Sequence, residues 1–195
     1  MAPIIHTVNL RKVYAVGKER VVALNDVSIS IEKGEFCCIV GQSGSGKSTL
    51  LNQLAGLEKP TRGKVFIGSH EISAMTEDEL AKFRQAHLGF IFQSYNLLPT
   101  MTAAENVALP LMFKGISRSQ RLAMARALLH DTPIYLFDEA TSNVDAESEN
   151  DIMAQIHALA GRKTVLLISH RLANVTASDE IYVLERGNIV QHGTH

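Results

Sequence analysis

The segment that most constrains this chain is Gly41-Gln42-Ser43-Gly44-Ser45-Gly46-Lys47-Ser48. It follows the apolar run from Glu35 to Val40 and leads into a stretch, Lys47 to Ala55, whose residues favour a helix. The spacing G-x-x-x-x-G-K-S between a buried strand and a helix is typical of a loop whose backbone N–H groups surround phosphate oxygens. The alternative is a chance glycine-rich turn. Such a turn has no reason to lie between a strand and a helix, so this context favours the phosphate-binding loop. We therefore predict a nucleotide-binding loop.

Each part of this loop has a predicted task. Glycine has no Cβ, so the backbone can turn its N–H groups inward around a phosphate group. The N-terminus of the following helix adds a partial positive charge. We expect Lys47 to reach the β- and γ-phosphates of a nucleotide and Ser48 to bring its hydroxyl to Mg²⁺.

The rest of the sequence alternates strand and helix patterns. Near-continuous apolar runs predict buried parallel strands at 35–40, 134–137 and 165–168. Weaker strand patterns cover 64–67, 88–92 and 181–184, an alternation over 27–31 predicts a half-buried strand, and turns are predicted at 60–63 and 186–188. Helices are predicted at 77–86 after a Thr76–Glu79 capping box, at 121–129, and at 146–160 between Asp145 and Gly161. Together these elements predict an α/β fold with a largely parallel core sheet flanked by helices.

Polar residues directly follow two of the predicted buried strands. Asp138 and Glu139 come after the run 134–137, and His170 comes after 165–169. Because open α/β sheets bind ligands at the carboxyl ends of their strands, we expect these residues near the phosphate loop. Asp138 would bind Mg²⁺, Glu139 would act as a general base toward water, and His170 would contact a γ-phosphate. The alternatives are an Asp-Glu pair that only ends a strand and a histidine that only packs.

Composition sets outer limits on this interpretation. The chain has 195 residues, 46% of them hydrophobic, and its 19 basic and 20 acidic residues give a net charge of −1. That balance offers no electrostatic footprint for nucleic acid, so we expect no nucleic-acid partner. No apolar run approaches the roughly 20 residues of a membrane-spanning helix, and the adjacent Cys37 and Cys38 would face opposite sides of a strand. We expect a cytoplasmic domain without disulfides.

A set of motifs occurs in one order along the chain: Tyr14, Gly41 to Thr49, Gln93, Asp138-Glu139, Ser142-Asn143-Val144-Asp145 and His170. In these motifs the chain resembles the nucleotide-binding domain of ABC transporters over most of its length. The resemblance implies ATP and Mg²⁺ as cofactors. It also implies a P-loop NTPase fold with an N-terminal antiparallel β portion and a shortened helical subdomain. Tyr14 would stack on adenine, Thr49 would belong to the phosphate loop, and Gln93 would serve Mg²⁺ and the attacking water.

One feature of that family is missing. The signature loop Leu-Ser-Gly-Gly-Gln should precede the helix predicted at 121–129, but Lys114-Gly115-Ile116-Ser117-Arg118 stands in its place. Asp138 follows Gln93 by only 45 residues, which is short for the family. The first part of the chain resembles ATPases of lipoprotein-release or macrolide-export systems, and the part from Arg121 resembles exporter-type domains. An internal deletion or a gene fusion near 115–120 is our hypothesis for both features.

The resemblance also implies a function and partners. We expect one ATP-binding cassette domain over 1–195, with a catalytic core at 1–92 and 131–195 and a truncated helical subdomain at 93–130. It would hydrolyse Mg-ATP beside a second cassette, on the cytoplasmic face of a membrane, to drive transport through a separate membrane-spanning subunit. The alternative is a degenerate module that hydrolyses ATP only beside an intact cassette. A soluble ABC-type protein of DNA repair or translation is disfavoured by the neutral charge and the lack of a second cassette.

Overall fold

The computed structural model of the chain describes residues 3–92, 98, 100–102, 105–106, 132–139, 146–169 and 175–194. The chain divides into two compact units, residues 1–93 with 132–195, and residues 94–131. In the second unit the Thr102 hydroxyl accepts from the Glu105 N–H, and the Glu105 carboxylate accepts from the Thr102 N–H, which is a capping box. The first unit contains two β-sheets and the helices that pack on them.

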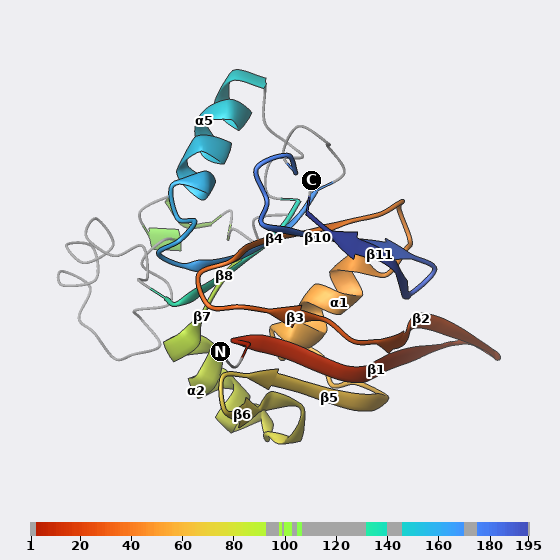
Figure 1. Ribbon diagram of the computed structural model, residues 1–195. Coiled ribbons are helices and arrows are strands. Elements are labelled where there is room, and N and C mark those ends of the chain that lie inside the picture. The colour runs from red at the N-terminus through yellow and green to blue at the C-terminus, as the bar shows by residue number, and fades with distance from the viewer. Residues whose placement is uncertain are drawn as a thin grey trace. The chain divides into compact units, whose positions relative to one another are not determined.

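A six-stranded sheet, counted over the described residues, forms the core of the first unit (Figure 1). Its order is β11 (Asn188–Gly193), β10 (Glu180–Glu185), β4 (Phe36–Val40), β9 (Thr164–Ile168), β8 (Ile134–Asp138) and β7 (Leu88–Ile91). Strands β10, β4, β9, β8 and β7 pair in parallel, and β11 pairs antiparallel with β10. The predicted α/β fold with a largely parallel core sheet is confirmed.

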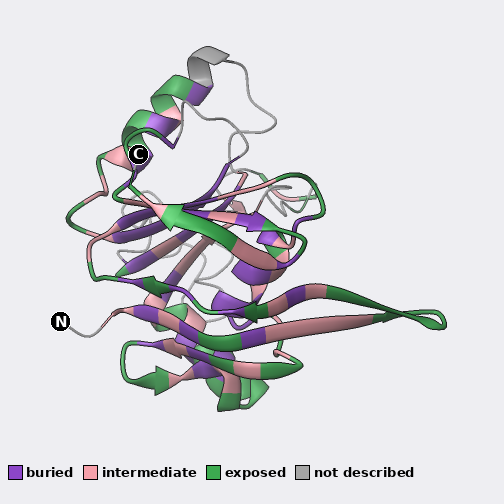
Figure 2. Cartoon of the chain, turned by 45° about the vertical axis from the view of Figure 1, so that its right-hand side comes forward, coloured by how far each residue is buried: buried purple, intermediate pink, exposed green. Residues whose placement is uncertain are grey.

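The inner strands read as continuous apolar runs because side chains are buried on both faces of the sheet (Figure 2). On one face Cys37 packs in a cluster with Leu50 of α1 (Lys47–Leu54). On the other face Cys38 packs in a cluster with Met153 of α5 (Ala146–His157). The two cysteines are free and point to opposite faces, as predicted. Burial raises the pKa of the Cys38 thiol to about 11, so this thiol stays protonated at neutral pH.

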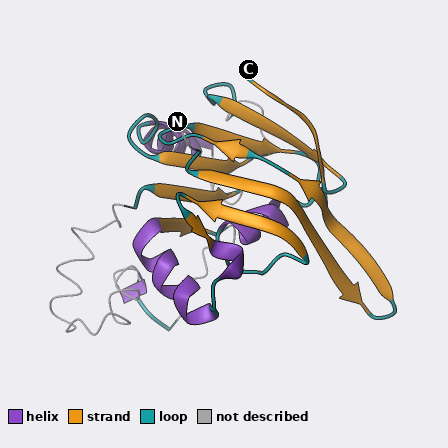
Figure 3. Ribbon diagram, turned by 60° about the horizontal axis from the view of Figure 1, so that its bottom comes forward, coloured by secondary structure: helices purple, strands orange, loops and turns teal. Residues whose placement is uncertain are grey.

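An antiparallel sheet contains the N-terminal part of the chain. Its strands are β1 (Ile5–Val16), β2 (Glu19–Val27), β3 (Ser30–Ile31), β5 (Arg62–Ile67) and β6 (His70–Glu71). They pair in the order β2-β1-β5-β6, and β3 pairs with β1. The hairpin of β1 and β2 extends past the other strands (Figure 3). The N-terminal antiparallel β portion that the family resemblance implies is therefore present.

The single strand predicted at 27–31 is wrong, because β2 ends at Val27 and β3 begins only at Ser30. Between them the Thr7 hydroxyl donates to the Val27 carbonyl and accepts from the Ile29 N–H, each at 3.1 Å. The Thr7 N–H also donates to the Ile29 carbonyl at 3.0 Å, so one residue of β1 holds the segment between the two strands through both its side chain and its backbone. The predicted burial pattern still holds, since the apolar residues of this segment are buried and both of its serines are exposed.

The helices follow the predictions with shifted ends. The capping box at Thr76 opens α2 (Glu77–His87), as predicted, after the short η1 (Ile72–Ala74). Helix α5 ends three residues earlier than predicted, because residues 158–162 form turns in which the Gly161 N–H donates to the Gly34 carbonyl. The turn predicted at 186–188 joins β10 to β11, whereas the one at 60–63 is shorter because β5 begins at Arg62. The helix predicted at 121–129 lies outside the described residues.

Candidate functional site

The phosphate loop lies at the carboxyl end of β4 and runs directly into α1. Across the sheet, Ile168 of β9 pairs with Ile39 of β4 on one side and with Asp138 of β8 on the other. The three inner strands therefore end at the same level. This register brings the loop and the Asp138-Glu139 pair to one edge of the sheet, where open α/β sheets bind ligands.

Two loop glycines are required by their contacts with neighbouring strands. Gly46 has a φ of 104°, and a Cβ at this position would lie 2.4 Å from the Ala23 carbonyl oxygen of β2. A Cβ at Gly41 would lie 2.2 Å from the Leu184 carbonyl oxygen of β10. Gly44 differs, because its φ is 76° but no atom lies within 4 Å of the Cβ position. The loop is thus pressed against the backbone of two strands at its ends and is open in its middle.

The Lys47 ammonium lies inside the curve of this loop. Its Nζ donates to the carbonyl oxygens of Gly41 and Gln42 at 2.8 and 2.9 Å, and the side chain is buried. The Ser45 N–H also donates to the Gln42 carbonyl, which closes the turn. The Ser45 hydroxyl oxygen is buried and has no hydrogen-bond partner among the described residues. A positive charge and a polar group therefore lie where a phosphate would have to bind.

Ser48 and Asp138 meet across the site. The Ser48 hydroxyl donates to Asp138 Oδ1 at 3.3 Å, which joins the first turn of α1 to the end of β8. Burial raises the pKa of Asp138 above its ordinary value, and the hydrogen bond from Ser48 opposes that rise. A hydroxyl and a carboxylate side by side are oxygen ligands of the kind that Mg²⁺ prefers.

Glu139 faces the same hollow as the loop. This hollow has a volume of about 270 Å³ and is lined by Ser43, Gly44, Gly46, Lys47, Ser48, Thr49 and Glu139. The Glu139 backbone is left-handed, with a φ of 44°, and its N–H donates to the Ile168 carbonyl at 3.2 Å. A non-glycine residue in that conformation carries strain of order 1 kcal/mol. The strand end thus turns Glu139 away from the path of β8 and toward the loop.

Tyr14 lies on β1, half-buried, with its hydroxyl fixed by a hydrogen bond of 2.7 Å to Glu58 Oε2. Burial and this hydrogen bond raise the pKa of Tyr14, and the Thr49 side chain opposes the rise through a hydrogen bond to the same hydroxyl. Because Thr49 belongs to the first turn of α1, the hydroxyl of Tyr14 lies beside the end of the phosphate loop. The structure thus brings together Tyr14, Gly41 to Thr49, Asp138 and Glu139.

Gln93, the segment Ser142 to Asp145 and His170 lie outside the described residues. Their predicted roles therefore stay predictions. Ser169, the residue before His170, donates its N–H to the Ile39 carbonyl at the end of β4. The described chain thus leaves β9 at the edge of the sheet that carries the loop.

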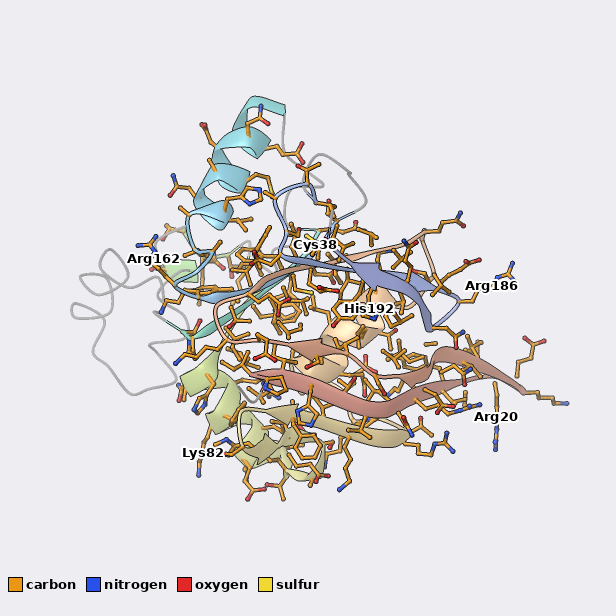
Figure 4. All side chains as sticks on the ribbon, in the orientation of Figure 1. Arg20, Cys38, Lys82, Arg162, Arg186 and His192 are labelled. Atoms are coloured by element: carbon orange, nitrogen blue, oxygen red, sulfur yellow. The ribbon has the colours of Figure 1, made fainter. Side chains whose placement is uncertain are left out.

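Sequence reasoning missed a residue that supports the loop from far along the chain. The Gly187 N–H donates to the Ser45 carbonyl at 2.9 Å, and the Gly187 carbonyl accepts from the Asn25 N–H at 2.8 Å. A Cβ at Gly187 would lie 2.6 Å from the Ala23 carbonyl oxygen. Next to it, Arg186 lies exposed at the outer end of the β10–β11 turn (Figure 4). The sequence signal was only a glycine in a predicted turn, with nothing to connect that turn to the loop.

Within the part of the chain that the structure describes, none of the helices is both long enough and apolar enough to cross a bilayer.

Comparison with known proteins gives one family. The family model described as ABC transporter matches residues 24–121. An uncharacterized ABC transporter ATP-binding protein of Thermotoga maritima is 35% identical, over 97% of this chain and 94% of that protein. The macrolide export ATP-binding/permease protein MacB of Hyphomonas neptunium is 36% identical over 96% of this chain. The aligned part covers only 34% of the length of MacB.

A solved structure is similar in both sequence and fold. It is the dimeric, post-hydrolysis state of the ATP-binding cassette MJ0796 bound to ADP and Pi, from a protein of Methanocaldococcus jannaschii. Its TM-score to this chain is 0.88, at 33% identity and over 97% of this chain and 98% of that one.

These relatives are longer than this chain where the two align. The alignments to the Thermotoga, Hyphomonas and Methanocaldococcus proteins run over 223, 220 and 218 residues, although this chain has 195. Each relative therefore carries residues that have no counterpart here. We predict that the missing residues fall between Gln93 and Asp138, where the spacing is short and the signature loop is missing.

Proposed function

Because this chain belongs to the ABC transporter family, as one of its nucleotide-binding domains, we propose that it binds Mg-ATP and hydrolyses it to ADP and phosphate. The observation that carries this proposal is the meeting of three groups at one edge of the sheet. Lys47 lies inside the phosphate loop, Ser48 contacts Asp138, and Glu139 lines the same hollow. The hydrolysis would drive transport through a separate membrane-spanning subunit.

The loop residues Gly41 to Thr49 would bind the phosphates. Their backbone N–H groups and the N-terminus of α1 offer donors and partial positive charge to oxygen atoms. The Lys47 ammonium donates to two loop carbonyls and can exchange those bonds for phosphate oxygens, which accept more strongly because they carry charge. The buried Ser45 hydroxyl gives the cradle a further polar group.

Ser48 and Asp138 fit a magnesium ion, because they place a hydroxyl and a carboxylate oxygen 3.3 Å apart beside the loop. We propose Gln93 as a further ligand. When bound, Mg²⁺ supplies positive charge that offsets the charge developing on the phosphate oxygens.

Glu139 would act as the general base. A water oxygen forms a bond to the γ-phosphorus while the bond from that phosphorus to the β–γ bridging oxygen breaks, and Glu139 takes a proton from the water. His170 would contact the γ-phosphate and Gln93 would orient the water. Tyr14 would stack on the adenine ring.

The relatives suggest the partners. MacB is named as an ATP-binding/permease protein, and MJ0796 is dimeric in its solved structure. We propose that this chain pairs with a second cassette and with a membrane-spanning subunit, on the cytoplasmic face of the membrane. Residues 93–130 would form a truncated helical subdomain within one cassette domain.

A second candidate function follows from the missing signature loop and the longer relatives. In the family, that loop closes on the nucleotide of the opposite cassette. A chain without it can bind ATP but offers its partner no second set of phosphate donors. In this case hydrolysis would occur only when an intact cassette supplies those donors.

Two variants test the proposal. Lys47→Ala should weaken ATP binding by at least about 100-fold, because a buried charge–phosphate contact is lost. Glu139→Gln should leave binding intact and remove turnover. ATP binding is measured by calorimetry and turnover by phosphate release, alone and after mixing with an intact homologous cassette. The exposed Lys33→Ala is the matched control. Wild-type ATP affinity in Lys47→Ala would refute the phosphate site, and turnover that appears only in the mixture would favour the degenerate module.

A further inference from the structure

A cluster of polar side chains lies beside the phosphate loop, with Glu58 at its centre. Glu58 Oε2 accepts from the Tyr14 hydroxyl at 2.7 Å and lies 3.2 Å from the Lys12 ammonium. Glu58 Oε1 accepts from the Asn52 side-chain amide at 3.3 Å. We name these four residues the Glu58 cluster. One carboxylate thus uses both oxygens to connect two side chains of β1 with one of α1.

The backbone holds Glu58 at this place. Glu58 follows α1 closely, and its N–H donates to the carbonyl of Asn52 within that helix. The Lys12 ammonium also donates to the carbonyl of Lys59, the next residue. Two residues further on, the Thr61 N–H donates to the Arg11 carbonyl of β1. The segment from α1 to β5 is therefore fastened to both elements that Glu58 connects.

The ring of Tyr14 has one face covered. Lys12 and Tyr14 are two residues apart on β1, so their side chains lie on the same face of the strand. The Lys12 ammonium lies over the Tyr14 ring, 5.1 Å from its centroid, in a cation–π contact. The Lys12 side chain is only 15% exposed, so this cation is held in place. A flat ligand could stack only on the opposite face.

The charge of Glu58 is suited to this arrangement. Burial opposes ionisation, but the hydrogen bonds from Tyr14 and Lys12 and the charge of Lys12 outweigh it and lower the pKa of Glu58. The carboxylate is therefore ionised at neutral pH. An ionised acceptor binds both the hydroxyl and the ammonium more strongly than a neutral one.

We infer that Glu58 is a positioning residue for the nucleotide base: through Lys12 and the Tyr14 hydroxyl, it fixes the Tyr14 ring so that the face opposite Lys12 meets the base. The inference rests on the proposed function, in which the phosphates bind at residues 41–49. Asn52 and Thr49 belong to α1, the helix that follows the phosphate loop. The cluster therefore holds the Tyr14 ring against the same helix whose N-terminus would bind the phosphates. The base and the phosphates are thus positioned from one rigid element.

The test compares ATP with inorganic triphosphate, which has the phosphates but no base. Both dissociation constants are measured for the full chain by calorimetry. Glu58→Ala should weaken ATP binding by about five- to tenfold and leave triphosphate binding unchanged, since only contacts to the base are disturbed. Tyr14→Phe removes one oxygen and keeps the ring, so it should act in the same direction with a smaller effect. Glu58→Gln keeps an acceptor oxygen and should recover part of the loss.

Glu71→Ala is the matched control. Glu71 also binds a lysine, Lys64 at 3.0 Å, and its side chain is 31% exposed compared with 32% for Glu58. It lies on β6, outside the cluster, and its loss should change neither dissociation constant. If Glu58→Ala unfolds the chain, as judged by circular dichroism, Tyr14→Phe tests the same contact with minimal change.

Four outcomes would overturn the inference. Equal losses for ATP and triphosphate in Glu58→Ala would mean that Glu58 only stabilises the fold. Unchanged ATP binding in both Glu58→Ala and Tyr14→Phe would mean that the ring needs no such support. A wild-type chain that binds neither ligand would refute the proposed function, and the inference with it. A wild-type chain that binds both ligands equally would leave the phosphate site intact and remove only the role in base binding.

Discussion

The phosphate loop and the Glu58 cluster lie at the two ends of α1 and are held in place by different kinds of contact. The loop is held by backbone atoms: Gly41 and Gly46 press against strand carbonyls, and the Gly187 N–H donates to a loop carbonyl. The Glu58 cluster is held by side chains, through a carboxylate that meets a hydroxyl, an ammonium and an amide. Backbone contacts leave almost no freedom, whereas side chains can rearrange when one member changes.

This difference predicts how each region responds to substitution. A Cβ added against a carbonyl oxygen cannot be avoided by a rotamer change, so the loop or the strand must move. Loss of one side-chain partner in a partly exposed cluster leaves the other contacts in place and lets water replace the missing one. We therefore expect large effects on folding and on phosphate binding at the loop, and small effects confined to the base at the Glu58 cluster.

The largest effect is expected for Gly46→Ala. The new methyl group would lie 2.4 Å from the Ala23 carbonyl oxygen, and the residue would keep a φ of 104°. Steric overlap and backbone strain together should lower the free energy of unfolding by about 3 kcal/mol and abolish triphosphate binding. Urea denaturation and calorimetry with triphosphate measure the two effects.

Gly44→Ala separates steric overlap from backbone strain. Gly44 has a positive φ of 76° but no atom within 4 Å of its Cβ position. Its substitution should cost only the strain, about 1 kcal/mol. If the two variants lost the same stability, contact with β2 would not be the reason for glycine at residue 46.

A smaller effect is expected for Gly187→Ala, which touches the loop from the β10–β11 turn. Its Cβ would lie 2.6 Å from the Ala23 carbonyl oxygen and would displace the N–H that donates to Ser45. We expect a loss of about 2 kcal/mol in stability and about tenfold weaker binding. The loss should be equal for ATP and triphosphate, unlike that of Glu58→Ala.

Gly17→Ala is the control for that variant. Gly17 is the turn glycine of the β1–β2 hairpin, with a φ of 61° and no atom within 4 Å of its Cβ position. Its substitution should lower stability slightly and leave both ligands bound as before. Equal binding losses in the two variants would show that strain in a hairpin turn, and not contact with the phosphate loop, weakens binding.

The two regions also differ in how far the sequence predicted them. The loop was predicted in full because backbone geometry fixes both residue type and spacing within one short segment. The inner strands were predicted because burial on both faces leaves continuous apolar runs. Glu58 and Gly187 were not predicted, because Glu58 meets Tyr14 on β1 and Gly187 meets Ser45 in the loop, and both partners lie far away in sequence. Strand β1 had no predicted range because its charged and polar residues break the apolar alternation.

The smallest effect concerns pH and separates the Glu58 cluster from the loop, whose N–H donors do not titrate. The pKa of Glu58 is lowered in the folded chain, below the ordinary value of 4.5, because the bonds from Tyr14 and Lys12 outweigh burial. The stability that Glu58 contributes is therefore fully present above pH 4.5 and is lost as the pH falls through its lowered pKa.

We expect wild type to exceed Glu58→Gln in unfolding free energy at pH 7, by less than about 1 kcal/mol as for other partly exposed ion pairs. The difference should shrink as the pH falls below 4.5. Urea denaturation at a series of pH values measures it. In a Tyr14→Phe background one cause of the lowered pKa is gone, so the difference should be smaller, and its decline, which still begins near pH 4.5, should be complete at a higher pH. An identical pH curve in both backgrounds would mean that the Tyr14 hydroxyl does not hold the charge of Glu58, and that Lys12 and Asn52 hold it instead.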